Sequence, residues 1–139
     1  MKAEELRARR ILAFRDLAAQ ELDAARLLAE GHGAQAAYFL QQSVEKLARG
    51  LLEMLDIPVG PTHNIQQLAR MMDGRPEWTE RFAALDELSV ASTRYRYPGP
   101  KGNISTVDPK RLGELIVAVT ALNEEFAAVL TAFTRKNGG

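Results

Sequence analysis

The sequence predicts an all-α protein, a single up-and-down antiparallel bundle of about five helices, three long and two shorter, within one domain of residues 1–139. Apolar residues recur at three- and four-residue spacings, while the alternation typical of strands is nearly absent. Glycine and proline gather in short segments between these periodic stretches, which predicts short connections. The length suits one domain, and the 46% apolar content suits a self-sufficient core.

The first two predicted helices are long and cover residues 4–30 and 34–55. Gly31-His32-Gly33 separates them, because glycine tolerates the positive φ angle found at helix ends. Both helices are expected to bury one apolar stripe. The stripes consist of Phe14, Leu17, Ala24, Ala25 and Leu28 in the first helix, and of Ala37, Leu40, Val44, Leu47, Leu51 and Leu55 in the second.

Two shorter helices are predicted next, over residues 63–72 and 77–92. Pro58 and Pro61 exclude a continuous helix before the first of them, and Thr62 is its expected N-cap. A turn containing glycine and proline separates the two helices. The expected inward-facing residues of the second are Trp78, Phe82, Leu85 and Leu88.

The last predicted helix follows a loop over residues 94–106 that is rich in glycine and proline. Asp108 is its expected N-cap, and Pro109 occupies the first helical position, where proline is well tolerated. Its apolar stripe is the most regular in the chain. The stripe consists of Leu112, Leu115, Val119, Leu122, Phe126, Val129 and Phe133.

Composition excludes several classes of function. The 18 basic and 18 acidic residues cancel, so any nucleic-acid contact must be a local patch. The chain has no cysteine and only two histidines, so we expect no disulfide, no metal site and no cofactor. No apolar run approaches the ~20 residues of a membrane span, and the charged N-terminus does not resemble a signal peptide. We therefore expect a cytoplasmic protein without a membrane partner.

The second predicted helix also has a polar face opposite its apolar stripe. Tyr38, Gln41, Gln42, Glu45 and Arg49 follow three- and four-residue spacings on this face. A helix face in contact with water is the ordinary interpretation. A pairing or ligand face is the alternative, because amides and a Glu–Arg pair make directional contacts. The residue types alone leave both interpretations open.

The glycine- and proline-rich loop begins with an Arg-Tyr-Arg-Tyr sequence at residues 94–97. Arginine can clamp phosphate and tyrosine can stack on a base, so the segment is a candidate site for a nucleotide or RNA. Alternatively, the tyrosines pack over the end of the bundle and the arginines bind carbonyls at helix C-termini. The candidate binding residues are Arg94, Tyr95, Arg96, Tyr97 and Lys101.

No residues are predicted to be catalytic. No phosphate-binding glycine loop and no Ser–His–acid arrangement can be argued from the sequence. His63 lies beside Thr62 at a predicted helix start, where its imidazole can hydrogen-bond a neighbouring loop. A structural role is therefore expected for it.

Three motifs together resemble the HEPN family (higher eukaryotes and prokaryotes nucleotide-binding). Residues 37–49, AYFLQQSVEKLAR, resemble the second-helix signature of that family. Thr62-His63, followed by Ile65 and Leu68, resembles its third helix, and Arg96-Tyr97-Pro98 resembles its Arg-Tyr-Pro loop. The resemblance covers nearly the whole chain in order.

The resemblance implies a homodimer that binds a nucleotide or RNA, encoded beside a small nucleotidyltransferase in a two-gene module that often behaves as toxin and antitoxin. It also favours the second interpretation of the polar helix face. The implied dimer or ligand face consists of Tyr38, Gln41, Gln42, Glu45, Lys46, Arg49 and His63.

One departure from the family bears on catalysis. Ribonucleolytic members carry an arginine followed after four to six residues by histidine, but no histidine follows His63 here. Arg26 and His32 match that spacing only at the end of the first helix. We therefore expect a non-catalytic binder. The alternatives are a metal-independent ribonuclease toxin that uses Arg94 or Arg96 with a tyrosine, and a purely structural dimeric partner.

Overall fold

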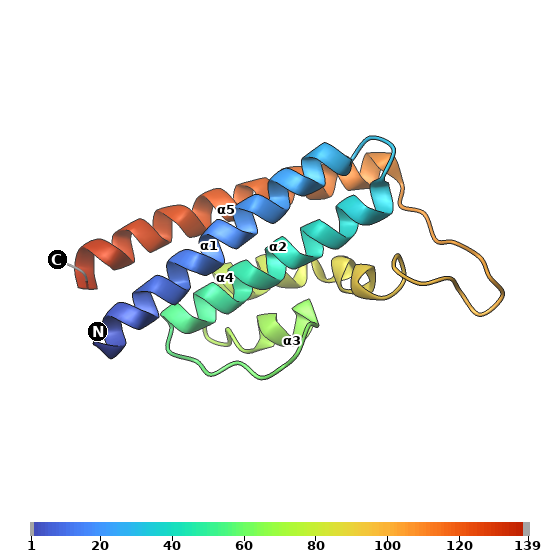
Figure 1. Cartoon of the computed structure of the whole chain (residues 1–139). Helices are drawn as coiled ribbons and strands as arrows, with labels where there is room; N and C mark the ends of the chain where they lie inside the picture. The colour runs from blue at the N-terminus through green and yellow to red at the C-terminus, as the bar shows by residue number, and fades with distance from the viewer. Residues whose placement is uncertain (1, 138–139) are drawn as a thin grey trace.

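The computed structural model describes residues 2–137, and in this range the chain forms helices and no strand. Figure 1 shows the three long helices running alongside one another, with the shorter helices beside α2 and the loop before α5 projecting at one end. The predicted all-α bundle is confirmed, with three short helices in place of two. The elements are α1 (Ala3–Leu28), α2 (Gly33–Met54), α3 (Ile65–Arg70), α4 (Pro76–Ala83), the 3₁₀ helix η1 (Asp86–Ser92) and α5 (Pro109–Asn137).

Helix α2 is the centre of the core and contacts α1, α3, η1 and α5. Its predicted apolar stripe is buried as far as Leu51, and Leu55 is half-buried. Gly50 allows close packing on this helix, because a Cβ atom there would lie 2.9 Å from the Phe126 ring and 3.1 Å from the Phe14 Cβ. The central position of α2 explains why even its polar residues are largely covered.

The predicted stripe of α1 is correct only in part. Ala25 is buried as predicted and Phe14, Ala24 and Leu28 are half-buried, but Leu17 is 43% exposed. The other buried residues of the helix are Ile11, Ala18 and Leu22. Alanine and leucine occur around the whole circumference of this helix, so several apolar stripes can be drawn on it. Packing against α2 selects one of them.

The third helix is shorter than predicted. It begins at Ile65 rather than at residue 63, and its N-cap is Asn64 rather than Thr62. The Asn64 side chain accepts a hydrogen bond from the Gln67 backbone amide at 3.0 Å. Thr62 accepts instead from the Asn64 amide, so it shapes the turn that leads into the helix.

The single helix predicted over residues 77–92 is also wrong, because the chain forms α4 and then η1. Asp86 lies at the break and accepts hydrogen bonds from the Gln66 amide at 3.0 Å and the Ser89 hydroxyl at 2.9 Å. This contact with the first turn of α3 redirects the chain. Phe82, Leu85 and Leu88 are buried as predicted, and Trp78 is half-buried.

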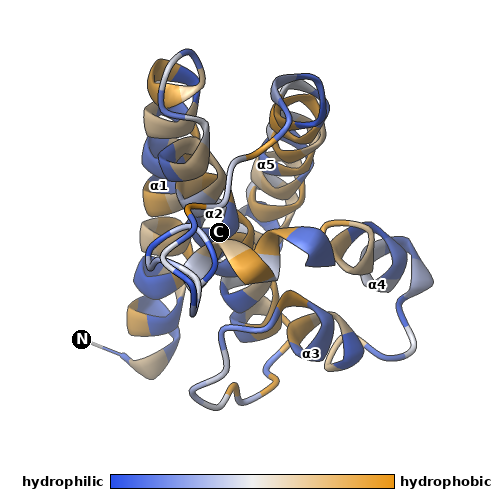
Figure 2. Ribbon diagram, turned by 90° about the vertical axis from the view of Figure 1, so that its right-hand side faces the viewer, coloured by the Kyte–Doolittle hydropathy of each residue, from blue (hydrophilic) through white to orange (hydrophobic). Residues whose placement is uncertain are grey.

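Helix α5 begins as predicted, with Asp108 accepting a hydrogen bond from the Arg111 amide at 3.3 Å. Its stripe is buried from Leu112 to Phe126, after which Leu130 is the buried residue. Figure 2 shows that this helix is rich in apolar residues. By length and composition alone, Pro109–Lys136 could cross a membrane, with a mean hydropathy of 1.6 over its most apolar stretch. Core helices of water-soluble proteins meet the same criterion.

Candidate functional site

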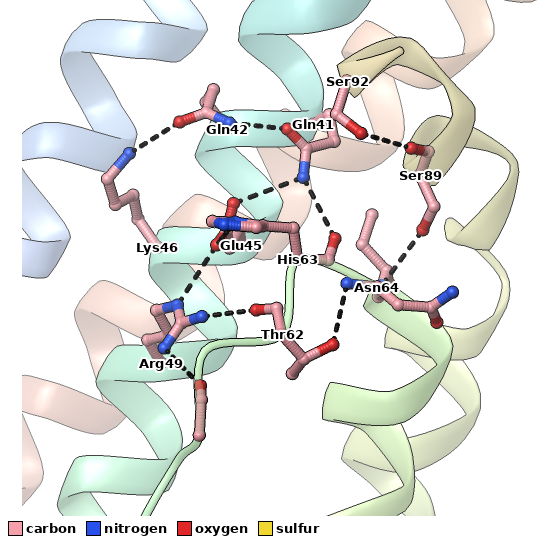
Figure 3. Close-up of polar contacts among 12 residues, drawn as sticks. Gln41, Gln42, Glu45, Lys46, Arg49, Thr62, His63, Asn64, Ser89 and Ser92 are labelled. Carbon is pink, nitrogen blue, oxygen red and sulfur yellow. Dashed lines mark hydrogen bonds and ion pairs between the residues drawn. The ribbon is translucent and has the colours of Figure 1, made fainter. Parts of the chain in front are cut away.

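The polar face of α2 is largely buried and centres on Glu45 (Figure 3). The Glu45 side chain is 6% exposed and accepts hydrogen bonds from three donors. Gln41 Nε2 lies at 3.3 Å, Arg49 Nε at 3.2 Å and His63 Nδ1 at 2.6 Å from its carboxylate oxygens. The interpretation as a face in contact with water is therefore wrong for Gln41 and Glu45, because both pack under another segment of the chain.

Residues 56–64 cover this face, and their backbone carbonyls bind its side chains. Arg49 donates to the Gly60 carbonyl at 3.3 Å and to the Thr62 carbonyl. Gln41 Nε2 donates to the His63 carbonyl at 3.3 Å. A segment interrupted by two prolines forms no regular structure of its own, so its carbonyls need donors from elsewhere. Gln41 and Arg49 supply these donors and fix the segment on α2.

His63 contributes its ring to the same cluster, but most of the ring faces outward. Its side chain is 69% exposed, and its Nδ1 is the atom that meets Glu45. No residue among 2–137 makes a hydrogen bond or ion pair with its Nε2. The imidazole was expected to bind a neighbouring loop, and it binds helix α2 instead.

A chain of polar contacts continues from Gln41 to α1. Gln42 donates to Gln41 at 2.7 Å, and Lys46 donates to Gln42 at 3.2 Å and to Glu21 at 2.6 Å. Burial raises the pKa of Glu21, while Lys46 acts in the opposite direction. Glu21 Oε2 is buried and has no hydrogen-bond partner among the described residues. Glu21 was not predicted as a site residue. The polar residues of α2 that face it could have indicated a polar partner on α1.

The structure brings the Arg/Tyr segment to the N-terminal half of α2. The Arg96 guanidinium lies 5.1 Å from the centre of the Tyr38 ring and 5.7 Å from that of Tyr97. Tyr97 is 63% exposed, whereas Tyr95 is half-buried and packs against the core. Tyr38 is thus the residue that links the polar face of α2 to the loop.

The cations of this loop are not engaged by the part of the chain that the structure describes. Arg94, Arg96 and Lys101 are exposed, and no residue among 2–137 accepts a hydrogen bond from their side chains. Residues 88–107 contain these three cations and no acidic residue, although the whole chain has no net charge. The segment therefore has a local charge of +3 at one end of the bundle (Figure 1).

A metal site is not apparent in the part of the chain that the structure describes. No group of three or more His, Asp or Glu side chains there could hold a metal ion. The chemistry that the site offers is therefore hydrogen bonding, charge and aromatic stacking, together with one oriented imidazole.

Comparison with protein families identifies the family of this chain. The family model described as HEPN domain matches residues 13–126, which include all of α2 and the Arg-Tyr-Pro loop. The chain belongs to the HEPN family. This membership supports a function related to nucleotides or RNA. Searches of curated proteins and of solved structures give no significant match.

Proposed function

We propose that this HEPN protein binds a nucleotide or a short single-stranded RNA at an Arg–Tyr platform, defined as Tyr38, Arg94, Arg96, Tyr97 and Lys101. The observation that carries the proposal is the Arg96 guanidinium held over the Tyr38 ring in a segment with a charge of +3. Such a combination of cations and aromatic rings suits single-stranded nucleic acids, because every base has a face that can stack and every linkage has a phosphate.

Each part of the platform has a distinct task. The Tyr97 ring is mostly exposed and can stack on a base. The Arg96 guanidinium lies over two tyrosine rings, and no residue among 2–137 accepts a hydrogen bond from it, so its N–H groups can donate to a phosphate. Arg94 and Lys101 add charge, and no acceptor among residues 2–137 competes for their side chains. Tyr95 is not included, because it packs against the core.

The cluster around Glu45 has a supporting role in this proposal. Gln41, Glu45 and Arg49 already satisfy one another and the carbonyls of residues 60–63. They hold the shape of the face beside which Tyr38 presents its ring. Lys46 reaches α1 and does not face the platform.

We propose that the protein acts as a homodimer in a two-gene module with a minimal nucleotidyltransferase, in the manner of toxin and antitoxin. The local charge of the platform would let RNA or a nucleotide bridge the two proteins. The adjacent reading frame tests the module, since a small nucleotidyltransferase is expected there.

Fluorescence polarisation with a short labelled single-stranded RNA, and calorimetry with ATP and GTP, test the binding. The Arg94→Ala/Arg96→Ala variant is expected to lose about tenfold or more in affinity, since a hydrogen bond to a charged group contributes about 1.5–3 kcal/mol. The matched control is Arg9→Ala/Arg70→Ala, which also removes two exposed arginines, one from α1 and one from α3. An equal loss in both variants, or no binding by the native protein, would sink the proposal.

The same RNA samples, resolved on a gel, address catalysis. The binding proposal expects intact RNA after incubation with the protein. Cleavage that disappears in Arg96→Ala would instead identify a ribonuclease that lacks the family's usual arginine–histidine spacing.

A further inference from the structure

The two histidines of this chain lie in very different surroundings. His32, between α1 and α2, is exposed, and its ring makes no hydrogen bond or ion pair within residues 2–137. The His63 ring places Nδ1 2.6 Å from the buried Glu45 carboxylate (Figure 3), yet its side chain is 69% exposed. The binding platform does not explain this contrast, because neither histidine belongs to it.

Holding the covering segment in place does not account for the position of the His63 ring. The backbone around it already receives hydrogen bonds at the Gly60, Thr62 and His63 carbonyls. The ring adds one bond and leaves most of its own surface in water. A side chain that served only for packing would gain more from burial.

We propose that Nε2 of His63 is a phosphoryl-acceptor site, made nucleophilic by Glu45. A carboxylate can only accept hydrogen bonds, so the contact with Glu45 assigns the proton to Nδ1 and leaves the lone pair on Nε2. A buried carboxylate in this position also stabilises the positive charge that the ring acquires when Nε2 forms a bond. Gln41 and Arg49 fix the carboxylate, so the ring is oriented before a donor arrives.

The surroundings favour an anionic donor. Arg49 Nε lies 3.2 Å from the same Glu45 oxygen that accepts from His63, so a guanidinium charge lies next to the ring. A positive neighbour attracts the phosphoryl group and offers little to a neutral acyl donor. The side chain is 69% exposed, so a donor as large as another protein can approach the ring.

The donor class that balances the step most simply is an N-phosphoryl compound, whether phosphoramidate or a phosphohistidine on a protein. The Nε2 lone pair attacks phosphorus, the Nε2–P bond forms, and the P–N bond of the donor breaks. The donor nitrogen leaves with the bonding electrons, as ammonia in the case of phosphoramidate, whose nitrogen is already protonated. The ring keeps its Nδ1 proton against Glu45, and no oxidant or reductant is needed.

Phosphoramidate is the probe for the test, and the native protein carries its own control. After incubation near neutral pH, mass spectrometry under mild conditions locates the added phosphoryl group on each histidine. His63 is expected to react more than about tenfold faster than His32, given how strongly a buried acid activates a neighbouring histidine. Equal rates at the two histidines would overturn the proposal without any variant being made.

Two variants then separate activation from simple accessibility. Glu45→Gln should bring the rate at His63 close to that at His32, whereas Glu53→Gln, which alters a carboxylate of α2 paired with Arg10, should not change it. Circular dichroism shows whether each variant is folded. If folded Glu45→Gln reacts as fast as the native protein, the role of Glu45 is refuted. The Arg94→Ala/Arg96→Ala variant should react normally, so failure of the binding proposal and failure of this one are distinguishable.

Discussion

Arg49 and Arg96 carry the same guanidinium group in contrasting settings. Arg49 is largely covered and donates to Glu45, to the Gly60 carbonyl and to the Thr62 carbonyl. Arg96 is exposed and meets only the faces of two tyrosine rings. The donors of Arg49 are engaged by the protein, whereas those of Arg96 have no partner among residues 2–137.

This difference separates residues that maintain the fold from residues that can bind a ligand. A buried polar group must be satisfied by the protein, because water cannot reach it. An exposed arginine held over aromatic rings by cation–π contacts keeps a defined position and retains its donors for another molecule. The Glu45 cluster thus belongs to the first class and the Arg–Tyr platform to the second. His63 combines a fixed Nδ1 with an available Nε2.

The largest expected effect comes from the same substitution made in both regions. Arg49→Ala should lower the free energy of unfolding by about 3 kcal/mol, because it leaves Glu45 short of a partner and two carbonyls without donors. Arg96→Ala should change it by no more than about 0.5 kcal/mol, as is usual at the surface. Urea denaturation followed by circular dichroism measures both, and similar losses would erase the distinction between the two regions.

The salt dependence of RNA binding measures the contacts between the platform arginines and phosphate. Each contact between a cation and a phosphate of a single strand adds about 0.7 to the slope of log affinity against log salt concentration. Removing Arg94 and Arg96 together should therefore lower the magnitude of that slope by about 1.4. Polarisation titrations at several salt concentrations give the slope. An unchanged slope would mean that neither arginine contacts phosphate.

A smaller effect is expected from Tyr38→Leu, which removes the ring beneath Arg96. The cost in stability should be about 0.5–1 kcal/mol, the usual value of an exposed cation–π contact. RNA affinity should also fall, because Arg96 loses the surface that positions it. Tyr95→Leu is the matched control, since Tyr95 packs against the core and lies outside the platform. Equal losses of affinity in both variants would show that the platform has been drawn too narrowly.

The smallest expected effect concerns pH and Glu21. Because burial raises its pKa above the ordinary value of 4.5, the folded protein holds this proton more tightly than the unfolded chain. The contribution to stability is therefore present at low pH and is lost as the pH rises from about 4.5 through the raised pKa. Glu21→Gln should remove this trend. Thermal unfolding across a pH series measures it, and identical pH profiles would contradict the assignment.

Much of the helical architecture was accessible from the sequence. The stripes of α2 and α5 repeat every three or four residues, and Asp108-Pro109 marks a helix start, so both signals are local. The motifs on α2, at Thr62-His63 and at Arg96-Tyr97-Pro98 also sufficed to indicate the HEPN family, which the match over residues 13–126 confirms. Local sequence determines such features because helix propensity, capping and periodicity act within one or two turns.

The arrangement of the site was decided by tertiary structure. The sequence predicted Gln41, Glu45 and Arg49 on one helix face. It did not predict that carbonyls of residues 60–63 would accept hydrogen bonds from this face and cover it. Likewise, the hydrogen bond from the first turn of α3 to Asp86 accounts for the division of the predicted fourth helix into α4 and η1. Buried polar groups find their partners wherever the fold brings them, often far along the chain, and no local pattern encodes that choice. The sequence alone determined the three long helices and the family, and packing decided the short helices, which polar residues serve the fold and which remain available for a ligand.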